Sequence, residues 1–255
     1  LLTWCALNNE ENYCLAPGSL VLTDDLRWVP VETLQVGDGL LAFEEYAPLR
    51  RSGGGRHYTR AHVLSTGIVK RPVWRVTLSD NTVLEGSSEH PWLVAPRSPC
   101  GRHQAHRWER TDVIARLVNE GRCRLRFPRY VPTWKEEGGY AAGYLAAAFD
   151  GEGCVNHPAG HGHGLRIGMS QNKNAMLVRV HEFLTEKRIP FTVTKHSGNP
   201  GLVETHLRKL PECLKFLGAY RPARLLARFG DLLFAEKFRP RLQAFEWLDV
   251  VSAEY

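Results

Sequence analysis

The spacing of apolar residues changes along this chain of 255 residues, and the change limits what it can fold into. From Leu20 to Val94, short apolar runs alternate with polar residues and are separated by turn residues. Such alternation is typical of half-buried β-strands. After Gly138, runs with helical spacing are interleaved with strand-like runs. The sequence therefore predicts an all-β part followed by a mixed α and β part.

A basic stretch separates the two parts. Between Arg97 and Arg129 there are nine arginines and three acidic residues, with aromatic residues among them. Such a run is either a solvated linker or a nucleic-acid contact. Because the whole chain carries a formal net charge of +6, we favour a polyanionic partner, double-stranded DNA. We expect a linker or DNA-binding segment over 97–135, with DNA contacts from Arg107, Arg122, Arg124 and Arg126.

Other features exclude several classes of protein. Six irregularly spaced cysteines do not form a disulfide framework in a chain this long, which favours a reducing compartment. No apolar run reaches transmembrane length, so we expect no membrane partner. Residues 1–13 lack an initiator Met and a basic leader, so we expect flanking sequence from another protein and not a signal peptide.

The stretch YLAAAFDGEG, which ends at Gly153, closes a predicted helix with two acidic residues. Carboxylates are unfavourable there, because a helix C-terminus already carries negative partial charge. Gly139, Gly143 and Ala147 lie four residues apart, and small residues at this spacing let two helices approach closely. Since the chain has one such helix, we expect a homodimer through the 139–151 helix.

Two-fold symmetry would bring two Glu152 carboxylates together at the helix ends. Like charges in that position are costly unless a cation neutralises them. Mg²⁺ prefers carboxylate and water oxygens, and other divalent cations are possible. A metal cluster on a basic dimer can orient water and stabilise a phosphodiester transition state. The other interpretation is an ordinary helix end with solvated acids.

With the α-β-β-α-β-β-α-α order of elements predicted from Gly138 onwards, this stretch resembles the LAGLIDADG homing endonucleases. Leu145 to Gly153 match the family motif, with Ala147 in place of its first glycine. The resemblance implies an α+β endonuclease domain in αββαββα order. It also implies a Mg²⁺ site at Glu152 and Asp150, with Asp150 in a structural role at the helix end.

The same resemblance implies further site residues. Gln171, in MSQNK, corresponds to a polar residue beside the metal waters, and Lys209, in HLRKLPE, to a basic residue that assists the transition state. Its neighbour Arg208 and, as a weaker choice, Lys195 in TVTKH are the alternatives for the basic residue. The implied reaction is cleavage of both DNA strands by a homodimer, with the strands reading the major groove. The basic residues expected at DNA in this part are Arg166, Lys173, Lys195 and Arg208.

The first part carries a second resemblance. The segment CLAPGSLVLTDDLRWVPVETLQVGDGLLAF, which begins at Cys14, resembles the N-terminal splicing motif of inteins. The segment GSSEHPWLV resembles the second splicing motif, with Ser87 three residues before His90. The resemblance implies an all-β Hint splicing domain into which the endonuclease is inserted. It also implies host-protein flanks, or exteins, and the cytoplasm of a bacterial or phage-infected cell.

The intein resemblance implies self-catalysed chemistry at the bond between Tyr13 and Cys14. The Cys14 thiol would attack the Tyr13 carbonyl and form a thioester. His90 would protonate the departing amine or destabilise the amide, and Ser87 would hydrogen-bond the scissile peptide. Because the C-terminal splicing motif is missing, we expect at most a thioester and the release of residues 1–13 to an added thiol.

The combined prediction is an all-β Hint (intein) domain plus an α+β LAGLIDADG endonuclease domain (αββαββα). Its segments are the N-extein flank 1–13, the N-terminal part of the Hint domain 14–96, the Arg-rich segment 97–135, the endonuclease domain 136–242 and the return segment 243–255. Two alternatives stay open. One is a catalytically inactive LAGLIDADG protein that only binds DNA or RNA, as a maturase or regulator does. The other is a non-splicing Hint autoprocessing domain.

Two groups of cysteine and histidine residues are candidate zinc ligands. Neither has the spacing of a standard structural zinc site, so both stay open. The groups are Cys100, His103, His106 and Cys123, and Cys154, His157, His161 and His163.

Overall fold

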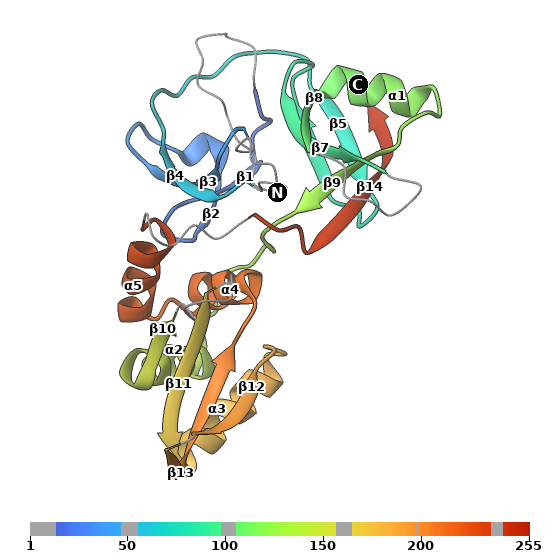
Figure 1. The fold of residues 1–255 in the computed structure, drawn as a ribbon. Coiled ribbons are helices and arrows are strands. Elements are labelled where there is room, and N and C mark those ends of the chain that lie inside the picture. The colour runs from blue at the N-terminus through green and yellow to red at the C-terminus, as the bar shows by residue number, and fades with distance from the viewer. Residues whose placement is uncertain (1–13, 47–55, 98–105, 157–164, 197, 236–241) are drawn as a thin grey trace.

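The computed structural model describes residues 14–46, 56–97, 106–156, 165–196, 198–235 and 242–255. Over these residues the chain is mainly antiparallel β-sheet, arranged as two two-stranded sheets, one four-stranded sheet and one six-stranded sheet, with five α-helices (Figure 1). No helix in these ranges is both long enough and apolar enough to cross a membrane.

The chain begins with two short hairpins. They pair β1 with β2 and β3 with β4, and a bridge between Thr23 and Leu40 links them. A 3-10 turn at Val31–Thr33 separates them. Their strands are β1 (Leu20–Leu22), β2 (Trp28–Pro30), β3 (Gly39–Phe43) and β4 (Tyr58–His62).

The six-stranded sheet has the order β6-β5-β14-β9-β7-β8, so the last strand of the chain lies in its middle. Helix α1 packs against β5 and β14, and Ile114 and Ala115 of α1 are fully buried in a core with Val76 and Phe127. The elements are β5 (Trp74–Leu78), β6 (Val83–Gly86), β7 (Pro91–Pro96), β8 (Arg107–Arg110), α1 (Thr111–Asn119), β9 (Leu125–Arg129) and β14 (Glu246–Glu254).

Residues 130–245 are inserted between two paired strands of that sheet. Arg129 at the end of β9 pairs with Glu246 at the start of β14, and the N–H of Phe245 donates to the carbonyl of Arg129 at 3.0 Å. The inserted residues therefore leave the sheet and return to it at one place, as a loop leaves a β-hairpin (Figure 1).

The inserted part contains the four-stranded sheet, in the order β10-β11-β13-β12, with α2 and α3 on the same side of it (Figure 1). Its elements follow in the order α2, β10, β11, α3, β12, β13, α4 and α5. They are α2 (Gly139–Glu152), β10 (Gly153–Asn156), β11 (Arg166–Asn172), α3 (Ala175–Glu186), β12 (Thr192–His196), β13 (Asn199–Leu207), α4 (Leu210–Tyr220) and α5 (Ala223–Leu233).

The inserted part is packed onto the first hairpin. Leu26 is fully buried in the same apolar cluster as Leu145 and Phe149 of α2, and the indole N–H of Trp134 donates to the carbonyl of Leu26 at 3.3 Å. An ion pair of 3.0 Å joins Arg221, which follows α4, to Asp25. One continuous apolar core thus crosses the boundary.

The predicted fold class is wrong. The Arg-rich stretch, expected as a linker or DNA-binding segment between an all-β domain and an αββαββα domain, folds as β8, α1 and β9 of the six-stranded sheet and its covering helix. The first part is therefore not all-β. The inserted part follows the α-β-β-α-β-β-α-α order expected from the sequence, which has one helix more than the αββαββα class. The pattern was missed because the apolar face of α1 is short and lies among exposed arginines, such as Arg116 and Arg122.

Two glycines in helices test this packing. A Cβ on Gly218 of α4 would overlap the Trp134 indole, whereas a Cβ on Gly230 of α5 would meet nothing within 4 Å. We expect Gly218→Ala to lower the free energy of unfolding by about 1–3 kcal/mol, because the buried ring cannot move aside. Gly230→Ala should raise it by up to about 1 kcal/mol, because alanine favours helices.

Urea unfolding of the two variants measures both effects. A Gly218→Ala protein as stable as the Gly230→Ala protein would contradict the tight contact between α4 and Trp134.

Candidate functional site

Cys14 lies against the turn that connects β6 to β7. Its N–H donates to Ser87 Oγ at 3.2 Å, and its carbonyl accepts from the N–H of Ser87 at 2.9 Å. The next two residues continue the pairing, since Leu15 forms a bridge with Gly86 and the N–H of Ala16 donates to the carbonyl of Glu85 at 3.2 Å. Both polar backbone groups of Cys14 are thus fixed by one residue.

The glycine at this turn permits the close approach. A Cβ on Gly86 would lie 3.2 Å from His90 Cβ, 3.2 Å from a ring carbon of Trp92 and 3.3 Å from the Cys14 carbonyl oxygen. These are tighter than ordinary van der Waals contacts, so a larger residue at position 86 would displace one or more of these three neighbours. The same measurement places His90 Cβ and the Cys14 carbonyl oxygen next to the same glycine.

His90 is fully buried, and its position is set by three contacts. Its N–H donates to the carbonyl of Ser87 at 3.1 Å, which closes the turn. Its carbonyl accepts from both the N–H and the hydroxyl of Thr111, each at 3.1 Å. Its ring lies 4.5 Å from the ring of Trp92, whose indole N–H donates to the Thr111 hydroxyl at 2.8 Å. Thr111, at the start of α1, was not identified from the sequence.

The imidazole of His90 is held in its neutral form. Burial lowers the pKa of His90 to about 4. Neither ring nitrogen has a hydrogen-bond partner among the residues that the structure describes. Buried polar atoms are normally paired, so an unpaired imidazole beside a cysteine backbone needs an explanation. Tyr13, which supplies the carbonyl of the predicted scissile bond, lies outside the described residues, as does the whole 1–13 flank.

The last residue of the chain lies near the same turn. The ring of Tyr255 is 5.0 Å from that of Trp74, and the Trp74 indole N–H donates to Ser88 Oγ at 3.3 Å. Trp74 also pairs with Gly86 across β5 and β6. Because Gly86 forms a bridge with Leu15, Tyr255 lies near the residues that pair with the segment after Cys14.

The acidic end of α2 forms a separate site. Asp150 Oδ1 accepts the N–H groups of Arg224 at 2.9 Å and of Leu225 at 3.1 Å, so it caps the start of α5. In return, Arg224 Nε donates to the carbonyl of Asp150 at 2.6 Å and Nη2 donates to that of Gly153 at 2.8 Å. Glu152 is exposed beside this network. The positive side chain of Arg224 therefore offsets the negative end of α2.

The other predicted catalytic residues are only partly brought together. Gln171 lies two residues beyond Met169, the partner of Gly153, and its Oε1 accepts from the N–H of Asn172 at 2.8 Å. Val203 pairs with both Gln171 and Lys195, which places Lys195 in the row of Gln171. Exposed Lys209 lies between β13 and α4. Glu152 precedes β10, whereas Lys195 lies on β12 at the opposite edge of the four-stranded sheet, so the strand register does not bring Lys195 beside Glu152.

The predicted DNA-contacting residues fall into two groups. Arg107 forms an ion pair of 2.9 Å with Glu109, Arg122 pairs with Glu120, and the Arg126 guanidinium lies 4.9 Å from the ring of Trp247. These three and the exposed Arg124 belong to the six-stranded sheet and its connections. The second group lies on or next to the four-stranded sheet and consists of Arg166, Lys173, Lys195 and Arg208.

Metal binding by one copy of the chain has little support in the described ranges. There, no three His, Cys, Asp or Glu side chains are grouped so that they could hold a metal ion. Of the candidate zinc ligands, His106 Nδ1 is 3.1 Å from the hydroxyl of Tyr130, and Cys154 is exposed. The other candidates apart from Cys123 lie outside the described residues, namely Cys100, His103, His157, His161 and His163.

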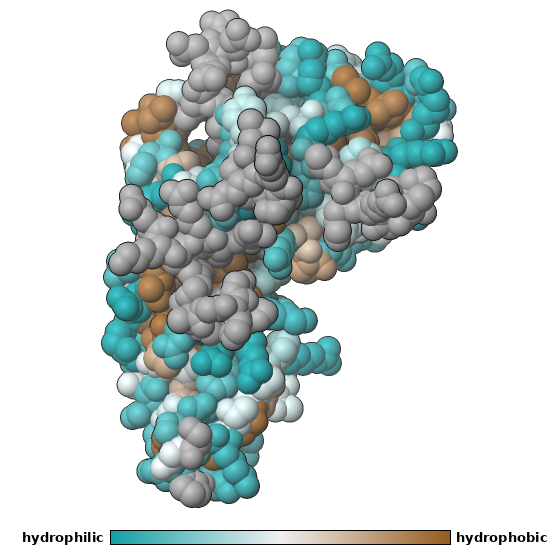
Figure 2. Space-filling view, viewed as in Figure 1, coloured by the Kyte–Doolittle hydropathy of each residue, from teal (hydrophilic) through white to brown (hydrophobic). Residues whose placement is uncertain are grey.

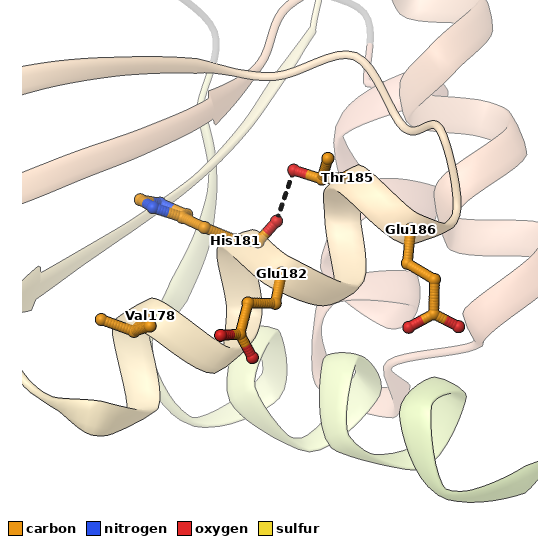
Figure 3. Close-up of a pocket in the computed structure, with 5 residues that line it drawn as sticks. All are labelled: Val178, His181, Glu182, Thr185 and Glu186. Atoms are coloured by element: carbon orange, nitrogen blue, oxygen red, sulfur yellow. Dashed lines mark hydrogen bonds between the residues drawn. The ribbon is translucent and has the colours of Figure 1, made fainter.

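A shallow pocket on α3 offers no set of catalytic groups. Figure 3 shows that His181 turns toward the sheet while Glu182 and Glu186 point away from it. His181 Nε2 is 2.8 Å from Thr205 Oγ1, and the Thr185 hydroxyl donates to the His181 carbonyl at 2.7 Å. The imidazole is thus used in packing, and the two carboxylates lie apart from it.

A scan against protein-family models finds no match for this sequence, and neither does a search of curated proteins.

The burial of His90 predicts a pH dependence of stability. The unfolded chain takes up a proton near the ordinary histidine pKa of about 6.5, whereas the folded chain resists protonation until about pH 4. Stability should therefore fall as the pH drops through this window. Between pH 7 and pH 4.5, wild type should lose about 2 kcal/mol more than His90→Gln.

Urea unfolding at the two pH values measures this difference, with His62→Gln as a control for loss of an exposed histidine. Equal pH dependence in wild type and His90→Gln would show that His90 is not held neutral by burial.

Proposed function

We propose that this chain performs the first step of intein-type protein splicing, in which Cys14 converts the peptide bond after Tyr13 into a thioester. The observation that carries this proposal is the pairing of both backbone groups of Cys14 with Ser87, next to a buried, neutral His90. A structural cysteine needs neither a fixed backbone N–H nor an unpaired imidazole beside it. A cysteine that must present its amide to an acid–base group needs both.

The step can be written with the residues in place. Cys14 Sγ attacks the Tyr13 carbonyl carbon, a C–S bond forms, and the C–N bond to Cys14 breaks. The thiol proton passes to the leaving nitrogen, so no other reactant is needed. In this proposal His90, which is buried in the turn that holds Cys14, transfers that proton from the thiol to the leaving nitrogen. Ser87 Oγ holds the Cys14 N–H and so orients the nitrogen that leaves.

Thiolysis tests this step in the full chain. With an added thiol such as dithiothreitol, wild type should release residues 1–13, because a thiol displaces a thioester. Cys14→Ala should release nothing, and His90→Gln should react about a hundredfold more slowly or worse, as expected on losing an acid–base group. Mass spectrometry measures the released fragment.

The control is Cys154→Ala. Cys154 is a free cysteine like Cys14, but it is exposed and lies in the inserted part. Its release should match wild type. Release from Cys14→Ala, or none from wild type, would rule out the proposed step.

A second function is favoured by the exposed face of α2. Gly139, Gly143 and Ala147 are exposed, and a Cβ on Gly143 would meet nothing within 4 Å. We propose that two copies of the chain pair through this face and cleave double-stranded DNA with Mg²⁺. Each copy would supply Glu152, since Asp150 is engaged with α5. When bound, the cation would activate water and stabilise the phosphodiester transition state.

Glu152→Gln separates cleavage from binding. On a pool of randomised DNA duplexes with Mg²⁺, wild type should cut a subset, and Glu152→Gln should still bind that subset but not cut it. The control is Glu182→Gln, an exposed acid on α3, which should cut as wild type does. Specific binding without cleavage by wild type would favour the binding-only alternative.

A further inference from the structure

One face of the four-stranded sheet is lined by polar side chains. The hydroxyl of Thr205 on β13 contacts His181 of α3, so its neighbours Glu204 and His206 point to the opposite side. We call that side the open face. By the strand register, its side chains are Cys154, Asn156, Arg166, Ser170, Asn172, Thr192, Thr194, His196, Leu202, Glu204 and His206. Leu202 is its one aliphatic side chain.

The surface over this sheet in Figure 2 is mostly hydrophilic or neutral in hydropathy. Arg166 and Arg208 both act on His206 electrostatically, so positive charge lies close to the centre of the open face. A polar sheet face with positive charge suits a polyanion better than it suits a packed protein core.

A carboxylate lies at the centre of this face and is held from two strands. Glu204 Oε2 is 3.1 Å from His206 Nε2 and accepts from the Thr194 hydroxyl at 3.3 Å. Glu204 Oε1 is 3.9 Å from His196 Nε2, beyond hydrogen-bond distance. The side chain is therefore fixed in position while one of its oxygens keeps capacity to accept a hydrogen bond.

The charge state of this pair follows from its surroundings. Burial lowers the pKa of His206, a buried residue whose ring lies over Gly168, so the imidazole is neutral. The hydrogen bond from His206 lowers the pKa of Glu204, which stays ionised. A neutral imidazole that donates through Nε2 orients the carboxylate without cancelling its charge.

A fixed negative charge is costly on a surface that binds phosphates. It weakens binding to every DNA sequence unless it accepts a hydrogen bond from a donor on a base. In the major groove, the cytosine amino group is the donor that carboxylates read, whereas guanine and thymine present acceptors that a carboxylate repels. Adenine also presents an amino donor, but its N7 acceptor lies beside that donor and opposes a carboxylate.

We propose that Glu204, oriented by His206 and Thr194, selects cytosine at one position of a DNA target by accepting a hydrogen bond from its amino group. This inference rests on the proposed DNA-cleaving function. Residues oriented in this way act on specificity more than on affinity, because phosphate contacts are unchanged by the base that is present.

Selection from a pool of randomised duplexes tests this assignment. Wild type should enrich a sequence with cytosine at one position, and Glu204→Gln should lose that preference by roughly tenfold or more while keeping the other positions. The matched control is Glu186→Gln, which removes the same charge from α3, where Figure 3 shows the side chain pointing away from the sheet. It should enrich the wild-type sequence.

Each outcome decides between the claims. If wild type enriches no sequence, the proposed DNA function fails and this inference fails with it. If wild type enriches a sequence and Glu204→Gln enriches the same one, only the inference on Glu204 is overturned. The same holds if Glu204→Gln weakens all positions equally. Thermal unfolding of both variants confirms that they are folded.

Discussion

The pairing of β9 with β14 is the constraint on which the rest of the structure depends. It places the last strand of the chain in the middle of the six-stranded sheet and closes the gap left by residues 130–245. Because Arg129 lies opposite Glu246, the inserted part can fold without separating the two strands. The same sheet carries the turn that holds His90, and β14 lies between β5 and β9 within it.

In each of the two candidate sites, neighbouring residues either set the protonation state of a side chain or compensate a charge. At Cys14, burial keeps His90 neutral, and neither of its ring nitrogens has a hydrogen-bond partner among the described residues. At the end of α2, Arg224 binds the carbonyls of Asp150 and Gly153, so two acids are tolerated where a helix normally favours cations. Glu152 is thus left exposed without the helix end being destabilised.

Motifs in the sequence were enough to predict part of this arrangement. Ser87, predicted beside Cys14, lies there although 73 residues separate the two, because each stands in a motif and the resemblance relates the two motifs to each other. His90 follows in the same turn as Ser87, because these two residues are close in sequence. The predicted fold class failed where arginines hid the apolar face of α1. The role of Arg224 was also missed, since its contact with Asp150 joins residues far apart in the chain and no local pattern marks it. Lys209 was preferred to Lys195 from the sequence, and only the strand register shows that Lys195 shares a row with Gln171.

The most direct test of the account is to observe the bond between Tyr13 and Cys14 itself. Protein labelled with ¹³C at the Tyr13 carbonyl and ¹⁵N at Cys14 shows a one-bond coupling between these atoms while they form an amide. We predict a second, uncoupled carbonyl signal typical of a thioester in wild type, absent from Cys14→Ser and weakened in His90→Gln. A single coupled amide signal in wild type, unchanged by either substitution, would contradict the claim that this site acts on its own backbone.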